Sequence, residues 1–223
     1  MALSKVNFNS MNVTPAASKA IKFNSSNNGL ETGDIGGSLV LLETTTISSS
    51  TSTVSFTSNI DSTYKEYIFK FIDIHPASEY GFFQFQADTG TNTNFNQTIT
   101  STAFTSTNNE AGSEALINYQ TGSDQAQGTA FQYLSDQLEA DNDSCLSGTL
   151  HIFDPSNTTF VKHFMAVTQF HQADPSSRKY YVAGYFNTTS ALTRFQFKIL
   201  GTSGGAGNSN TIDSGTIKLY GVS

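Results

Sequence analysis

The sequence predicts a mainly β protein: an antiparallel, jelly-roll-like β-sandwich with one short helix and an extended N-terminal arm. From Leu39 onward, segments rich in β-branched and aromatic residues recur about every ten residues, separated by turn residues, as is typical of such sandwiches. Strand-like and helix-like segments do not alternate, which disfavours a parallel sheet covered by helices. We therefore expect an arm over residues 1–38 and a sandwich over residues 39–223.

The predicted arm carries apolar side chains without strand or helix periodicity. We expect these side chains to anchor the arm to a partner: Leu3, Val6, Phe8, Val13, Ile21 and Phe23. A glycine-rich stretch at residues 33–37 follows them. Such a segment cannot bury its apolar groups within itself, so it lies either on its own domain or on a neighbouring subunit. We favour the neighbouring subunit.

Ten segments after the arm have the length and composition of strands. They cover residues 39–42, 51–57, 67–74, 83–87, 95–104, 149–153, 160–168, 180–186, 194–199 and 216–220. The segment 67–74 is apolar on both faces for most of its length, which predicts a central strand covered on both sides. In 194–199, Phe195, Phe197 and Ile199 alternate with polar residues, which predicts one buried and one wet face.

Residues 123–138 form the one segment with helical spacing. Ser123 can cap a first turn, and apolar residues follow at intervals of about three or four: Ala126, Ala130, Phe131, Leu134 and Leu138. Gly128 lowers the helix propensity of the segment. We expect a short helix here.

Composition and charge exclude several classes of protein. Eleven basic residues against eighteen acidic ones give a net charge of -7, which repels nucleic acid. No stretch has the roughly 18 apolar residues of a membrane span, and the N-terminus lacks the apolar core of a signal peptide. We expect a soluble protein made in the cytoplasm, without nucleic-acid binding or membrane insertion.

Residues with catalytic or metal-binding potential do not form a recognisable set. Asp88-Thr89-Gly90 resembles the motif of aspartic peptidases, but that chemistry needs two such carboxylates and the sequence holds one copy. His151 and His163 could approach each other on neighbouring strands, although no third ligand is spaced to join them. The acidic residues between Asp136 and Asp143 lack the pattern of a calcium loop. We therefore predict no catalytic residue, metal ligand or cofactor, and interpret the single Cys145 as a buried apolar side chain.

Tyrosines in the segment 180–186 are candidates for a binding surface. Four aromatic residues alternate across this segment: Tyr180, Tyr181, Tyr185 and Phe186. We favour packing of these rings in the sandwich core, and the alternative is that exposed rings such as Tyr181 and Tyr185 stack against sugars on a weakly charged sheet. The sequence contains no tryptophan, which weakens this signal. A sugar-cleaving enzyme would need two carboxylates held about 5 to 9.5 Å apart, and no pattern selects such a pair.

Five blocks together resemble a family of virion structural proteins from tailed phages of marine bacteria, cyanophages in particular. The blocks are residues 1–15 (MALSKVNFNSMNVTP), 60–76 (IDSTYKEYIFKFIDIHP), 158–166 (TTFVKHFMA), 182–191 (VAGYFNTTSA) and 214–222 (SGTIKLYGV). The 60–76 block is the most distinctive. The resemblance runs nearly end to end; it implies a place in a virus particle and assigns no catalytic residues.

The residues and the resemblance together lead to one expectation about function. We expect a structural subunit on the outside of a phage particle, on the head or on the tail or its fibres, made in the host cytoplasm and attached to other virion proteins by the arm. Assembly into a homo-oligomer such as a trimer fits such an arm. The alternative is a carbohydrate-binding module of the tail fibre that recognises a host-surface glycan through Tyr181 and Tyr185.

Overall fold

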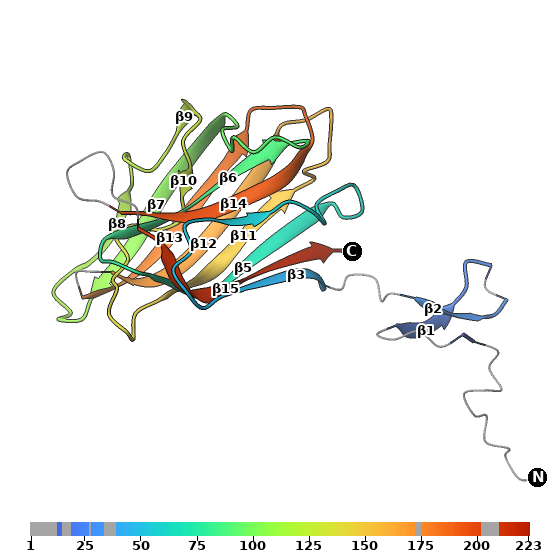
Figure 1. The fold of residues 1–223 in the computed structure, drawn as a ribbon, viewed down its shortest axis with the longest axis horizontal. Helices are drawn as coiled ribbons and strands as arrows, with labels where there is room; N and C mark the ends of the chain where they lie inside the picture. The colour runs from blue at the N-terminus through green and yellow to red at the C-terminus, as the bar shows by residue number, and fades with distance from the viewer. Residues whose placement is uncertain (1–12, 15–18, 27, 34–38, 173–174, 202–209) are drawn as a thin grey trace, which may run out of the picture. The chain divides into compact units, whose positions relative to one another are not determined.

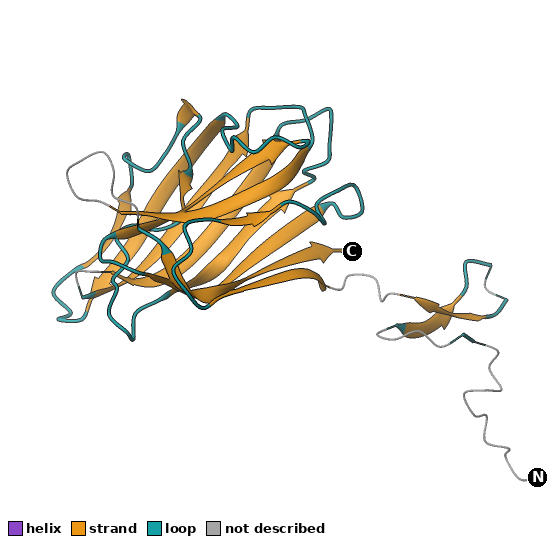
Figure 2. Cartoon of the chain, viewed as in Figure 1, coloured by secondary structure: helices purple, strands orange, loops and turns teal. Residues whose placement is uncertain are grey.

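The computed structural model describes residues 13–14, 19–26, 28–33, 39–172, 175–201 and 210–223. These residues form antiparallel strands joined by turns and contain no helix (Figure 2). Contacts along the chain define two compact units, which are described separately. One comprises residues 1–39 with Ser223, and the other is Val40–Val222.

The first unit contains a hairpin of two short strands, β1 (Ala20–Phe23) and β2 (Leu30–Gly33). Asn24 closes the connection between them, because its amide nitrogen donates to Gly29 O at 3.0 Å and its side chain bonds Asn28. The predicted anchor residues Leu3, Val6 and Phe8 lie outside the described residues.

The second unit contains two antiparallel sheets (Figure 1). The nine-stranded sheet has the order β3-β15-β5-β11-β12-β13-β7-β8, and β9 also pairs with β7. Its strands are β3 (Leu39–Ile47), β5 (Glu66–Pro76), β7 (Ile99–Asn109), β8 (Ala115–Tyr119), β9 (Ala126–Gly128), β11 (Leu146–Phe153), β12 (Lys162–Gln172), β13 (Ser176–Phe186) and β15 (Ile212–Val222). The four-stranded sheet has the order β10-β6-β14-β4. Its strands are β4 (Val54–Phe56), β6 (Gly81–Thr89), β10 (Gln132–Tyr133) and β14 (Leu192–Gly201).

Phenylalanine rings join the two sheets into one hydrophobic core. Phe197 of β14 lies 4.9 Å from Phe69 of β5, measured between ring centroids, and Phe85 of β6 lies 5.1 Å from Phe164 of β12. Edge-to-face contacts of this kind are favourable beyond the area they bury. The prediction of a mainly β, antiparallel fold is confirmed, and so is the buried face of Phe195, Phe197 and Ile199 on β14.

The predicted helix over residues 123–138 is wrong. This segment forms β9, β10 and turns that run along β7 and β6. Leu134 N donates to Phe83 O at 2.8 Å and Leu138 N donates to Gly81 O at 2.8 Å, so backbone bonds go to β6 instead of to a helical turn. Both leucines are buried in the core, and their spacing of four residues is also the spacing of apolar residues along one face of a helix.

The strand that is buried on both faces is β6, whereas β5 was expected to be. Ile72 of β5 is exposed and Lys70 half-buried, because the outer side of their sheet has no second layer among the described residues of Val40–Val222. On β6, Gln86 is fully buried and its side-chain nitrogen donates to Gln97 O and Ala130 O, both at 3.0 Å. Polar side chains on β6 are therefore covered by neighbouring loops, which satisfy them.

Candidate functional site

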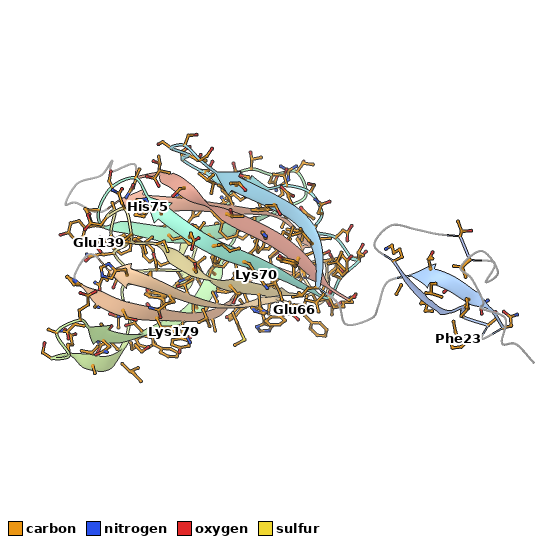
Figure 3. The ribbon with its side chains drawn as sticks, turned by 90° about the horizontal axis from the view of Figure 1, so that it is seen from below. Phe23, Glu66, Lys70, His75, Glu139 and Lys179 are labelled. Carbon is orange, nitrogen blue, oxygen red and sulfur yellow. The ribbon has the colours of Figure 1, made fainter. Side chains whose placement is uncertain are left out.

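The hairpin β1–β2 has one apolar and one charged face. The register places Ile21 opposite Thr32 and Phe23 opposite Leu30, so these side chains share a face. Lys22 and Glu31 lie on the other face and form an ion pair at 3.6 Å. Ile21 and Phe23 are 42% and 71% exposed (Phe23 is labelled in Figure 3).

The exposed apolar face has a consequence for stability. A two-stranded hairpin by itself is marginally stable in water at best, because it cannot remove its apolar face from solvent. Two of the predicted anchor residues, Ile21 and Phe23, thus lie side by side on this face. Val13 is half-buried outside any strand. Leu30, which lies opposite Phe23, was not predicted as an anchor residue. The turn residues at positions 27–29 could have indicated it, because they are typical of a hairpin between two short strands.

The outer face of the nine-stranded sheet, meaning the face turned away from the four-stranded sheet, carries both predicted tyrosines. Tyr181 and Tyr185 stand on it from β13, alternating with buried Tyr180 and Val182. The Tyr181 ring lies against Phe104 of β7, with centroids 4.6 Å apart and planes 11° from parallel. Lys179 places its ammonium 5.2 Å from the centre of the same ring (Lys179 is labelled in Figure 3). The Tyr181 ring is therefore largely engaged by its neighbours.

Tyr185 lines a hollow of about 470 Å³ on this face. Its ring meets His163 of β12 edge-on at 6.1 Å, and Met165, Phe153 and Thr100 complete much of the wall. Phe153 and His163 also line a second hollow of about 510 Å³. The surface around Tyr185 is thus hollowed and mostly apolar, whereas Tyr181 lies outside both hollows.

Three of the four histidines pair with carboxylates. His151 Nδ1 lies 2.6 Å from Glu66 Oε1, and His75 Nδ1 lies 2.7 Å from Asp213 Oδ1 (Glu66 and His75 are labelled in Figure 3). His171 contacts Glu139, and its Nε2 is 3.5 Å from Glu110 Oε1. His151 and His163 therefore have separate partners, Glu66 and Tyr185.

The acidic segment between Asp136 and Asp143 is used in structural contacts. Asp136 pairs with Arg178 at 2.5 Å, and Glu139 accepts a hydrogen bond from Ser144 as well as contacting His171. No group of three or more histidine, cysteine, aspartate or glutamate side chains among the described residues could hold a metal ion.

The remaining polar candidates also have structural roles. Asp88 is buried, and its carboxylate accepts from Thr89 N at 2.8 Å and Phe95 N at 2.9 Å, which shapes the turn after β6. Cys145 is half-buried instead of buried, and its Sγ lies 3.7 Å from Asp73 Oδ1. Burial, and then the charge of Asp73, raise the pKa of this thiol, so it is a weaker nucleophile than an ordinary cysteine.

Lys162 of β12 is the fully buried cation in the described part of the chain. Its ammonium donates to Phe160 O at 2.6 Å and Thr188 O at 3.2 Å, which ties the two loops together. Burial lowers the pKa of Lys162, and the charge of Asp154 opposes this change. Both hydrogen bonds of the ammonium go to backbone carbonyl oxygens, so Lys162 has a structural role in holding these two loops together.

None of the described residues forms a helix long and apolar enough to cross a membrane. The chain matches no known family model, no curated protein and no solved structure.

Proposed function

We propose that the chain is a structural subunit on the surface of a tailed-phage particle, as a head decoration or a tail or fibre component, and that its N-terminal arm anchors it to other virion proteins. The observation that carries this proposal is the hairpin β1–β2, which presents Ile21 and Phe23 on one exposed face. Because so small a hairpin is marginally stable alone, its apolar face needs a partner surface. The resemblance of the sequence to cyanophage virion proteins supports the same function.

The second unit fits a passive scaffold in this proposal. Its two sheets share a core dense in phenylalanine and need no disulfide, since the chain has one cysteine. We propose that it is a jelly-roll-like β-sandwich facing solvent, and that the arms of several copies hold together a homo-oligomer such as a trimer. A virion location and a passive role also agree with the structural contacts of its acidic residues and histidines.

Replacing Ile21 and Phe23 together by serine tests the anchor. Burying one such side chain contributes about 1.5–3 kcal/mol, so losing both should weaken attachment by about 100-fold or more. We expect the variant subunit to be absent from purified particles, measured by quantitative mass spectrometry. Deleting residues 1–38 should have the same effect.

Lys22→Ser is the matched control, because Lys22 lies on the opposite face of the same hairpin. It should incorporate normally. Thermal unfolding of Val40–Val222 should be the same in all variants, since the hairpin belongs to the other unit. Normal incorporation of the double variant would show that the arm is not the anchor.

The second candidate is host-glycan binding on the outer face, favoured by the hollow around Tyr185. That hollow combines the aromatic rings of Tyr185 and Phe153 with His163, and aromatic rings of this kind can stack against the apolar face of a sugar. The two activities are compatible, since a receptor-binding protein is also a particle component.

Tyr185→Ala is expected to lower adsorption to host cells and signal on glycan arrays by about tenfold, because a stacked ring contributes up to about 1.5 kcal/mol beyond its buried area. Tyr181→Ala should have a smaller effect, since its ring is engaged by Phe104 and Lys179. Tyr80→Ala, at an exposed tyrosine outside the hollow, is the control and should bind normally. Unchanged adsorption of the Tyr185 variant would contradict this second candidate.

A further inference from the structure

The strand β8 is an edge of the nine-stranded sheet whose outer side pairs with no other strand in the described residues (Figure 1). Such an edge offers unpaired backbone N–H and C=O groups to another chain. The hydrogen bonds between β8 and β7 show which backbone groups of β8 are free. Gln120 N donates to Ala103 O at 2.9 Å, and Asn109 N donates to Glu114 O at 3.1 Å.

Hydrogen-bonded pairs recur at every second residue of an antiparallel ladder. Since Glu114 and Gln120 are bonded to β7, the backbone groups of Leu116 and Asn118 also point toward β7. Those of Ala115, Ile117 and Tyr119 point away from it, along the open edge.

The side chains of this edge favour strand pairing. Strand β8 carries no charged residue, and Ile117 and Tyr119 are 74% and 55% exposed. Both lie on the outer face, since Ile117 is opposite Ser106 and Tyr119 is opposite Phe104. Proteins usually protect such an edge with a charge, a proline or a bulge. In β8 none of these is present.

The other edges of the second unit are less suited to pairing with a copy of themselves. A full antiparallel pairing of two β3 strands would place Glu43, at the middle of β3, opposite the Glu43 of the other copy, and like charges in that position are unfavourable. The edges of the smaller sheet, β4 and β10, have three and two residues, and β9, which pairs with β7 alone, has three. Strand β8 combines sufficient length with no charge.

We infer that β8 pairs antiparallel with β8 of a second copy about a two-fold axis at Ile117. In this register Ile117 faces Ile117 of the second copy, and Ala115 faces Tyr119. These are the residues whose backbone groups are free, so each facing pair can exchange two hydrogen bonds. The flanking Glu114 then faces Gln120, which avoids opposing like charges. The contact is isologous, as two-fold contacts between identical subunits are.

This contact is independent of the proposed anchor, because it involves no residue of the arm. Two tests separate them. The serine variant of Ile21 and Phe23 removes the anchor and leaves β8 intact, whereas a change at Ile117 removes the β8 contact and leaves the hairpin intact.

Charge substitution at Ile117 in the full chain tests the contact. Ile117→Lys and Ile117→Glu each lose the apolar Ile–Ile contact and place like charges opposite each other, so each alone should associate about 100-fold more weakly. An equimolar mixture of the two variants should recover association, because lysine then faces glutamate. Sedimentation velocity of each variant alone and of the mixture measures how much of the chain is associated. Leu41→Lys, at an exposed position of the edge strand β3, is the matched control and should associate as the unchanged chain does.

Amide hydrogen exchange locates the contact. In the unchanged chain the amides of Ala115, Ile117 and Tyr119 should become protected as the concentration rises, while those of Leu116 and Asn118 are protected at all concentrations by β7. In Ile117→Lys the concentration-dependent protection should disappear. Free exchange of the Ile117 amide at all concentrations, or failure of the mixed variants to associate, would overturn the inference.

Discussion

Replacing Phe197 by alanine is expected to lower the free energy of unfolding by about 3–5 kcal/mol, the usual cost of removing a buried phenylalanine. Phe197 is fully buried at the centre of the core. Its ring contacts five others: Phe56 at 6.0 Å, Phe69 at 4.9 Å, Phe71 at 5.3 Å, Phe83 at 5.9 Å and Phe85 at 6.4 Å between centroids. Because these rings come from both sheets, the cavity would lie between the layers and could not easily collapse.

Denaturant unfolding of the purified unchanged chain and of the purified Phe197→Ala variant measures the difference in their free energies of unfolding. Phe160→Ala is the matched control, since Phe160 is mostly exposed and its ring makes no contact with another aromatic ring of the described residues. The control should cost less than about 1 kcal/mol. Equal losses in the two variants would mean that the core does not depend on this ring cluster.

Replacing Gly148 by alanine is expected to destabilise the protein by about 3 kcal/mol or more, at the upper end of the cost of overpacking. A Cβ at this position of β11 would lie 2.4 Å from Val167 O and 2.7 Å from Thr168 Cα, both backbone atoms of β12. Neither atom can move without separating the two strands, which pair along most of their length. Glycine here permits close approach at an irregularity in the pairing of β11 with β5.

Gly122→Ala is the control for this prediction. An added Cβ at Gly122 meets no atom within 4 Å, so the change should lie within about 0.5 kcal/mol of zero. Thermal or denaturant unfolding measures both variants. If Gly148→Ala were as stable as the control, β11 and β12 would have to be farther apart than the structure places them.

The sequence predicts the faces of a strand correctly where one face is buried and the other is wet. In β14 the alternation of Phe195, Phe197 and Ile199 with polar residues follows directly from a core on one side of the sheet. The helix was predicted wrongly because Leu134 and Leu138 contact the core from an irregular segment along β6, and such contacts can produce the spacing of a helix. Strand β8 was missed, since it is a short edge strand whose Asn118 and Ile117 are both exposed.

The candidate sites show the same dependence on long-range contacts. The sequence identified Ile21 and Phe23 as exposed apolar residues, but their common face depends on pairing with Leu30 and Thr32. It also grouped Tyr181 with Tyr185. The surroundings of the two rings differ, because Phe104, on a strand distant in the sequence, packs against Tyr181, whereas Tyr185 lies beside a hollow. The jelly-roll topology and the glycan site remain predictions.

The position of β15 limits when the large sheet can form during synthesis. This strand lies between β3 and β5, so residues 39–47 have no place in the sheet until residues 212–222 have left the ribosome. Pairings between such distant segments also form slowly, because a long loop must close first. Until then a nascent chain exposes the unpaired backbone groups along the edges of β3 and β5. Chains that stop early should therefore be substrates for chaperones and proteases.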